Sequence, residues 1–233
     1  MKHGQKMNLP YMPAAVIFDM DGLIFDTEAL YQQAFQAASY AGGHNLPTAL
    51  IQSTIGVPWV QSRLLVLEQM GADFPVDQYG RDVTEHFTLL STTQLRLKPG
   101  VIELLDILDH LKLPRCIATS SSHSTVWSHL TAHGLVGRFD AVIAHGDYVS
   151  SKPAPDPFVV AAERLCLEPS LCLALEDSFN GVRSASAAGM MTYMVPDLLT
   201  PTPEIHSLCT GVVTDLHAVS MLILMASGAL NVS

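Results

Sequence analysis

The sequence predicts an α/β protein with a parallel sheet and a helical segment inserted after the first strand. Short apolar runs recur along the 233 residues, and stretches of helical length separate most of them. Apolar runs without alternation are typical of strands that are buried on both faces, as in parallel sheets. From about residue 29 to residue 95, however, no convincing buried strand interrupts the helical pattern. A parallel α/β core carrying a helical insert explains these features together.

The first strand is expected in the run AAVIF, at residues 14–18. Further strands are predicted at 115–119, 140–144, 171–175, 192–195 and 211–214. Helices are predicted between them at 100–110, 123–133, 155–166 and 180–188. The late apolar run at 218–230 is shorter than the roughly 20 residues that a membrane-spanning helix needs. We therefore interpret it as a C-terminal helix packed on the core.

The inserted segment contains three predicted helices, near residues 29–41, 58–70 and 77–92. The turn-forming stretches AGGHNLP and GADFP separate them, and LKPG marks the return to the α/β core. We expect a core domain formed by residues 1–28 and 95–233, and a helical domain formed by residues 29–94.

Composition limits the partners that the protein can have. Lys and Arg number 12 against 22 Asp and Glu, which gives a formal net charge of −10. This charge argues against binding to nucleic acid or to an anionic membrane surface. The four cysteines are far apart and form no CxxC pair, so we expect reduced thiols rather than a zinc site or disulfides. The N-terminus lacks the apolar segment of a signal peptide, and we expect a cytoplasmic protein.

Two carboxylates follow the first strand, because Asp19 and Asp21 come directly after AVIF and precede Gly22. Carboxylates on the same side repel each other unless a cation or a reaction uses them. The stretch could be a plain turn, for which Asp and Gly are common. A calcium loop of the EF-hand type is disfavoured, because that loop follows a helix and ends in a Glu.

Polar side chains also follow other predicted strands, at the sheet edge where ligands bind in α/β proteins. Thr119 and Ser120 end one strand in hydroxyl and backbone N–H donors, which suit an anion. Lys152 precedes a proline-rich turn, and Glu176 with Asp177 ends another strand. Each feature has an ordinary explanation, such as helix capping or a solvated charge. Their joint appearance favours a shared site.

The stretches DMDGLIFDTE, ATSS, SKPAPDPF and LEDSFNG resemble the four motifs of the haloacid dehalogenase superfamily. The resemblance is to the branch with a small helical cap after the first motif, which includes β-phosphoglucomutase and many phosphatases of sugar phosphates. It covers residues 14–200 of the core, whereas the cap fits in position and length more than in sequence. The resemblance implies a Rossmann-like, doubly wound parallel sheet with an inserted small α-helical cap.

The resemblance also implies roles for the carboxylates. Asp19 matches the nucleophile that forms an aspartyl-phosphate, and Asp21 matches the general acid and base. The family's Mg²⁺ would be held by Asp19, the backbone carbonyl of Asp21 and Asp177, often with help from Glu176. Oxygen ligands of this kind suit Mg²⁺. The ion would offset the repulsion between the carboxylates and admit an anionic phosphate.

Three further residues match the family's phosphate-binding positions. Thr119 and the backbone of Ser120 would bind non-bridging phosphate oxygens, and Lys152 would pair with the phosphate and with Asp19.

The cap reads the leaving group in this superfamily, and its sequence is less informative here. Residues 54–63 occupy the place of the cap's substrate-reading loop, with Trp59 and Arg63 as candidate substrate contacts. Packing of Trp59 between helices and solvation of Arg63 explain these residues equally well.

The motifs favour a phosphatase over three other activities. The mutases of the branch carry a histidine and an arginine where this chain has Tyr31 and Trp59, so a mutase is disfavoured. Dehalogenases lack the second aspartate, which is Asp21 here. A non-catalytic binding protein would be expected to have lost its nucleophile.

The expected function is a Mg²⁺-dependent phosphatase of a small phosphorylated metabolite. Sugar phosphates are the leading candidate substrates. A ribosyl monophosphate is the second candidate, because residues 176–197 resemble the corresponding stretch of phosphatases that act on pseudouridine 5′-phosphate. We expect a monomer or a weak homo-oligomer without nucleic-acid or membrane partners.

Overall fold

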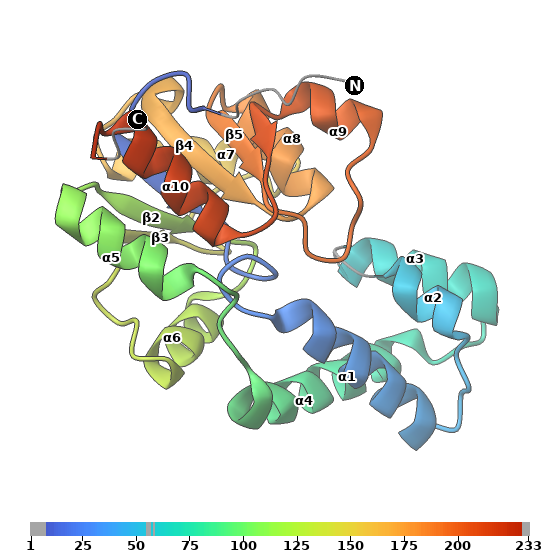
Figure 1. Cartoon of the computed structure of the whole chain (residues 1–233). Coiled ribbons are helices and arrows are strands. Elements are labelled where there is room, and N and C mark those ends of the chain that lie inside the picture. Colours follow the sequence, from blue (N-terminus) through green and yellow to red (C-terminus); the bar gives the residue numbers. More distant parts are fainter. Residues whose placement is uncertain (1–7, 55–56, 58, 230–233) are drawn as a thin grey trace, which may run out of the picture. The chain divides into compact units, whose positions relative to one another are not determined.

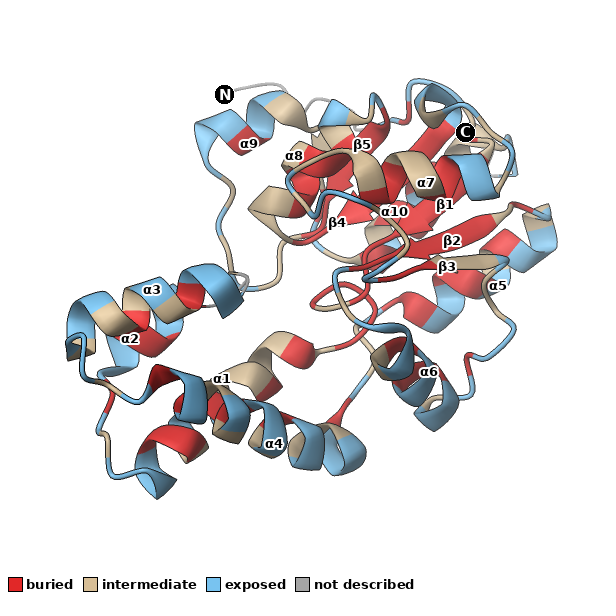
Figure 2. Cartoon of the chain, turned by 180° about the vertical axis from the view of Figure 1, so that it is seen from behind, coloured by how far each residue is buried: buried red, intermediate tan, exposed pale blue. Residues whose placement is uncertain are grey.

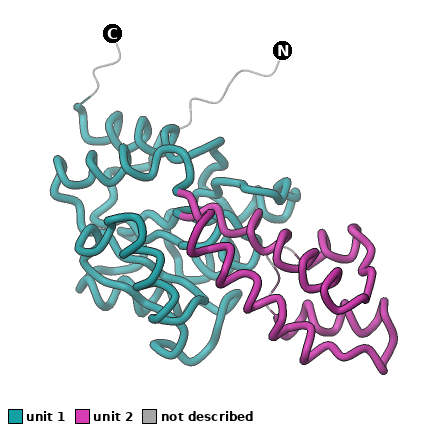
Figure 3. Tube along the Cα trace, turned by 90° about the horizontal axis from the view of Figure 1, so that it is seen from below, with its two compact units in different colours: residues 1–24, 97–233 teal, residues 25–96 magenta. Residues whose placement is uncertain are grey.

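A computed structural model describes residues 8–54, 57 and 59–229 of the chain (Figure 1). The chain divides into two compact units, coloured teal and magenta in Figure 3. We call residues 1–24 and 97–233 the core unit, and residues 25–96 the helical unit. The unit boundaries lie within a few residues of those expected at 28 and 95.

The core unit contains a six-stranded parallel sheet in the order β3-β2-β1-β4-β5-β6. The strands are β1 (Ala15–Phe18), β2 (Arg115–Ala118), β3 (Ala141–Ile143), β4 (Cys172–Glu176), β5 (Met191–Met194) and β6 (Gly211–Val212). This is the strand order of a Rossmann-like doubly wound sheet, so the predicted fold class is confirmed. Strand β6 is two residues shorter than the predicted run at 211–214, because its pairing with β5 ends at Val212.

Helices cover both faces of this sheet, as Figures 1 and 2 show from opposite sides. Helices α5 (Val101–Leu111) and α10 (Leu216–Ala226) pack against each other on one face. Helices α7 (Asp156–Arg164) and α8 (Phe179–Ala187) lie on the other face. The remaining core helices are α6 (His123–Ala132), α9 (Pro203–Leu208) and the 3-10 turn η1 (Pro169–Leu171). Among the described residues, no helix has the length and apolarity that crossing a membrane requires.

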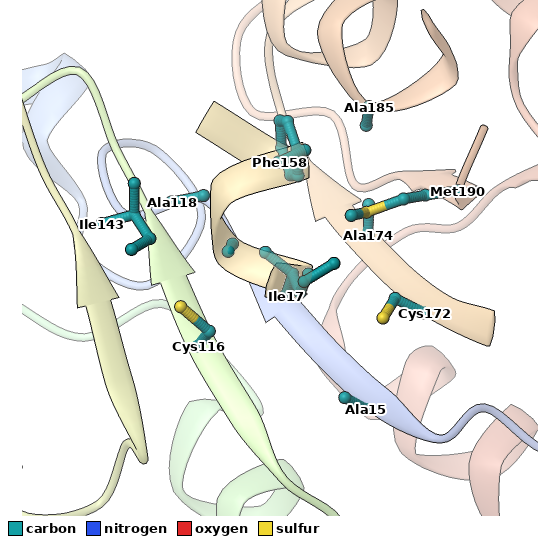
Figure 4. Packing of buried hydrophobic residues seen from close by; sticks show 12 residues of the cluster. Ala15, Ile17, Cys116, Ala118, Ile143, Phe158, Cys172, Ala174, Ala185 and Met190 are labelled. Carbon is teal, nitrogen blue, oxygen red and sulfur yellow. The ribbon is translucent and has the colours of Figure 1, made fainter. Parts of the chain in front are cut away.

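Alternate residues of the strands form the core beneath α7 and α8. Phe158 of α7 is fully buried and packs in one cluster with Ile17 of β1 and Ala174 of β4 (Figure 4). Many members of the cluster are small, which lets the helices pack close to the sheet. Its buried members are Ala15, Ile17, Cys116, Ala118, Ile143, Phe158, Ala161, Ala162, Cys172, Ala174, Ala185 and Met190. All four cysteines are free thiols, and burial raises the pKa of Cys116 to about 12.

The helical unit consists of α1 (Thr27–Ala41), α2 (Thr48–Ser53), α3 (Trp59–Met70) and α4 (Val76–Gln94). Helix α1 packs along α4, and the Tyr31 ring stacks on Phe87 with 3.8 Å between ring centroids. The Tyr79 hydroxyl, which is buried, donates a hydrogen bond of 2.8 Å to the carbonyl of Phe35. Helix α2 was not predicted, because six residues are too few to show helical periodicity.

Candidate active site

The order of the strands brings the predicted site residues to one edge of the sheet. Strands β2 and β3 lie on one side of β1, and β4, β5 and β6 lie on the other, so the strand order switches between β1 and β4. In α/β sheets, ligands bind in the crevice outside the carboxyl ends of the strands at such a switch point. Asp19 follows β1, Thr119 follows β2, and Glu176 is the last residue of β4. These residues are distant in sequence, but parallel pairing places their strand ends side by side.

Lys152, from the loop before α7, reaches into the centre of this edge. Its Nζ lies 2.5 Å from Oδ1 of Asp19 and 2.6 Å from Oε1 of Glu176. It also donates to the Ala118 carbonyl at 3.0 Å, and it lies 5.0 Å from the centroid of the Phe158 ring. The side chains of Lys152, Asp19 and Glu176 are only 7%, 10% and 0% exposed. Water therefore screens these charges weakly, and the ammonium is held rigidly.

Burial affects the pKa values of Lys152 and Asp19 in different ways. Burial alone would lower the pKa of Lys152, but the adjacent Asp19 and Glu176 carboxylates raise it overall, so the amine stays protonated. Burial raises the pKa of Asp19 well above its usual value, although Lys152 opposes this, and Glu176 and Asp21 raise it further. The single positive charge of Lys152 is therefore too little to neutralise the carboxylates of Asp19, Asp21 and Glu176.

Three carboxylates at this edge fit a divalent cation. Asp19, Glu176 and Asp177 each offer an oxygen, and these oxygens lie within 4.8 Å of one another. Carboxylate oxygens are the donors that Mg²⁺ and Ca²⁺ prefer. Gly22 leaves space for the Asp177 carboxylate, because a Cβ atom on this residue would lie 2.1 Å from Oδ2 of Asp177. Ligation through the backbone carbonyl of Asp21 stays a prediction.

Glu176 is also held from its other side. Its Oε2 accepts hydrogen bonds from the backbone N–H and the hydroxyl of Ser178, at 3.2 and 3.1 Å. The same hydroxyl caps α8 by accepting from the N–H of Gly181. A Cβ atom on Gly181 would lie 1.8 Å from the Glu176 carboxylate, so this first turn of α8 requires glycine. Glu176 therefore anchors Lys152 in addition to contributing to the acidic cluster.

Asp21 lies against the loop that follows β2. Its Oδ2 accepts a hydrogen bond of 2.7 Å from the Ser121 hydroxyl and a longer one of 3.4 Å from the Thr119 hydroxyl. Thr119 is buried, and its backbone N–H donates a hydrogen bond to the carbonyl of Ile143. Ser120 is exposed, and binding of phosphate by its backbone stays a prediction.

Sequence reasoning missed two residues of this loop region. Ser121 contacts Asp21, yet it is one of three consecutive serines and no spacing distinguishes it from its neighbours. Tyr148 donates from its hydroxyl to the Thr119 carbonyl at 3.1 Å, and it belongs to none of the motifs.

The two candidate substrate contacts of the cap lie in the helical unit. Trp59 is 37% exposed, and its indole packs against the Phe35 ring and covers Gly80, where a Cβ atom would lie 2.2 Å from the indole. Arg63 pairs with Asp77 at 2.9 Å on the surface. Residues 55, 56 and 58 of the predicted substrate-reading loop fall outside the described residues. Contact of Trp59 and Arg63 with substrate therefore stays a prediction.

The chain is similar to known phosphatases and to solved structures. A probable pseudouridine-5′-phosphatase of Drosophila melanogaster is 35% identical over 193 residues, which are 78% of this chain and 80% of that protein. The fructose-1-phosphate phosphatase of Escherichia coli is 32% identical over 180 residues, which are 76% of this chain and 93% of that protein. The crystal structure of a putative β-phosphoglucomutase from Thermotoga maritima superposes with a TM-score of 0.76 at 25% identity, covering 93% of this chain and 99% of that chain.

The family model of the haloacid dehalogenase-like hydrolases matches residues 13–189, which include the strand ends that carry Asp19, Thr119 and Glu176. The match also includes the loop that carries Lys152. Sequence motifs, strand order and the clustered side chains thus agree, and the chain belongs to the haloacid dehalogenase-like hydrolases.

Proposed function

We propose that the chain is a Mg²⁺-dependent phosphatase that hydrolyses a sugar phosphate or a related ribosyl monophosphate through an aspartyl-phosphate on Asp19. The observation that carries the proposal is the ion pair between buried Asp19 and Lys152. A second carboxylate, that of Asp21, follows Asp19 by two residues. Phosphoryl transfer with a carboxylate nucleophile needs these groups side by side. The phosphatase relatives support a phosphoric monoester hydrolase that acts on a small phosphorylated metabolite.

The metal site would consist of Asp19, Asp177 and Glu176, with the backbone carbonyl of Asp21. A bound Mg²⁺ would favour the ionised form of these carboxylates and offset their repulsion of an anionic substrate.

In the first half of the reaction, a carboxylate oxygen of Asp19 attacks phosphorus while the bond from phosphorus to the ester oxygen breaks. Lys152 donates to Asp19 and balances charge on the transferring phosphoryl group, and Thr119 donates to its non-bridging oxygens. Asp21 gives its proton to the leaving alkoxide, which departs as an alcohol.

In the second half, Asp21 is ionised and acts as a base. It takes a proton from a water molecule, whose oxygen attacks the phosphorus of the aspartyl-phosphate. The bond from phosphorus to Asp19 breaks, inorganic phosphate leaves, and both aspartates return to their starting states. One carboxylate therefore serves as nucleophile and the other as acid and then base.

Two relatives suggest the class of leaving group. The Escherichia coli relative is named for fructose 1-phosphate and the Drosophila relative for pseudouridine 5′-phosphate, so a hexose and a ribosyl ester are the leading candidates. A mutase is less well supported, because this chain has Tyr31 and Trp59 at the positions where the mutases carry a histidine and an arginine. A dehalogenase would not require the acid that Asp21 supplies.

The test is phosphate release from a panel of hexose, pentose, polyol and nucleoside monophosphates, including fructose 1-phosphate and pseudouridine 5′-phosphate. The reactions contain Mg²⁺, and Asp19→Asn is the blank. Release from one class of ester, abolished by EDTA, is the expected result. No release from any ester would refute the phosphatase, and isomerisation of glucose 1-phosphate with added bisphosphate would then indicate a mutase.

A further inference from the structure

We propose that Ser121 is a positioning residue for Asp21, which rests on the proposed function of Asp21 as acid and base. The Ser121 hydroxyl holds one carboxylate oxygen of Asp21 in place, so that the other oxygen faces the ester that loses its phosphate.

The contact is short and specific. The Ser121 hydroxyl lies 2.7 Å from Oδ2 of Asp21, within the usual range of a hydrogen bond to a carboxylate. The Thr119 hydroxyl approaches the same oxygen only to 3.4 Å. Both hydroxyls thus converge on Oδ2, and Ser121 makes the stronger of the two hydrogen bonds.

Ser121 is itself held on both sides of its backbone. Its N–H donates to the hydroxyl oxygen of Thr119 at 3.0 Å, and its carbonyl accepts from the N–H of His145 at 2.9 Å. The turn around His145 is closed by Asp147, which accepts from the N–H of Ala144 at 3.0 Å. A side chain that orients an acid must have a fixed backbone of its own, and this backbone meets that condition.

The residue type suits the two protonation states of Asp21. A serine hydroxyl is both a donor and an acceptor of hydrogen bonds. It donates to the ionised carboxylate, which has no proton to give, and it can accept from the protonated acid by rotation about one bond. The contact can therefore persist through both halves of the reaction.

The test compares Ser121→Ala with Ser121→Thr and with Ser124→Ala. Ser124 is an exposed serine in the first turn of α6, and its hydroxyl lies 2.8 Å from that of Ser122 rather than on Asp21, so it is a matched control. Each variant is assayed with the best alkyl ester from the panel and with an aryl phosphate. An aryl leaving group needs little protonation, so its release in the first half-reaction does not depend on the acid.

We expect Ser121→Ala to lower kcat for the alkyl ester by about tenfold, the effect of one hydrogen bond to a charged group, with little change in KM. The loss for the aryl ester should be several-fold smaller, Ser121→Thr should restore most of the rate, and Ser124→Ala should behave as wild type. Equal loss on both esters, or a change confined to KM, would overturn the proposal, because both would indicate a role in binding phosphate.

A crystal structure of Ser121→Ala separates this inference from the proposed function, because it does not require turnover. The Asp21 side chain should lose its single orientation and occupy more than one rotamer, with the fold otherwise unchanged. An Asp21 carboxylate that stays in its original position would overturn the proposal even if the enzyme were inactive. Failure of the wild type on every ester would instead refute the phosphatase.

Discussion

The variant Gly22→Ala tests the shape of the proposed metal site separately from the chemistry of its ligands, because it changes none of the acidic residues. The φ of Gly22 is +85°, a region that L-residues rarely adopt, and an added Cβ would lie 2.1 Å from Oδ2 of Asp177. Asp177 is buried, so its carboxylate cannot swing freely into solvent. The substitution should therefore both strain the backbone and displace Asp177.

The two effects have different magnitudes and appear in different measurements. A left-handed conformation costs a non-glycine residue about 1–2 kcal/mol, which lowers the free energy of unfolding. Relief of the collision requires a movement of about 1 Å, and misplacement of that size can lower activity by about 100-fold. Metal–ligand distances tolerate only about 0.2 Å, so the Mg²⁺ concentration for half-maximal rate should rise as well.

Gly137→Ala is the matched control, because φ there is +83° and nothing lies within 4 Å of the added Cβ. Urea unfolding in EDTA should show that both variants lose stability, because both place an alanine in the left-handed region. The free energy of unfolding of Gly22→Ala should be equal to or lower than that of Gly137→Ala, because the collision with Asp177 adds strain. Phosphate release titrated with Mg²⁺ should be impaired only in Gly22→Ala. The reasoning is refuted if Gly22→Ala keeps wild-type activity and Mg²⁺ response, or if Gly137→Ala loses activity to the same degree.

Three further variants test the mechanism and the loop after β3. Asp19→Asn should abolish phosphate release while circular dichroism shows a folded protein, and residual activity near wild type would contradict a nucleophilic role. Asp21→Asn should be severely impaired on alkyl esters but less on aryl phosphates, whereas equal impairment would count against an acid. The hydrogen bond from the N–H of Ala144, and to a lesser degree the contact with His123, lowers the pKa of Asp147 below its usual value. The ionised Asp147 carboxylate therefore stabilises the folded protein above about pH 4, and this stabilisation is lost as pH falls through the lower folded pKa. Asp147→Asn should thus lower the urea midpoint at neutral pH, and this difference should shrink in acid; a difference that grows in acid would contradict the assignment.

The predictable part of the fold and site is the part encoded locally. The apolar runs predicted all six strands to within a few residues, because strands buried on both faces require continuous apolar side chains. Asp19, Thr119 and Glu176 could be proposed as site residues because each follows or ends such a run. Helices α2 and α9, of six residues each, are too short to show a period, so only their packing reveals them.

The sequence by itself determined which strand ends carry carboxylates, hydroxyls and an amine, since these residues are adjacent to the strands that present them. The pairing of Lys152 with Asp19, 133 residues away, was expected only from the family resemblance, and tertiary structure alone decided that the same ammonium also bonds to Glu176. Tertiary structure also decided that Ser121, rather than the serines beside it, contacts Asp21. The physical reason is that such contacts depend on which strands pair and how the loops pack, and local spacing along the chain does not specify either.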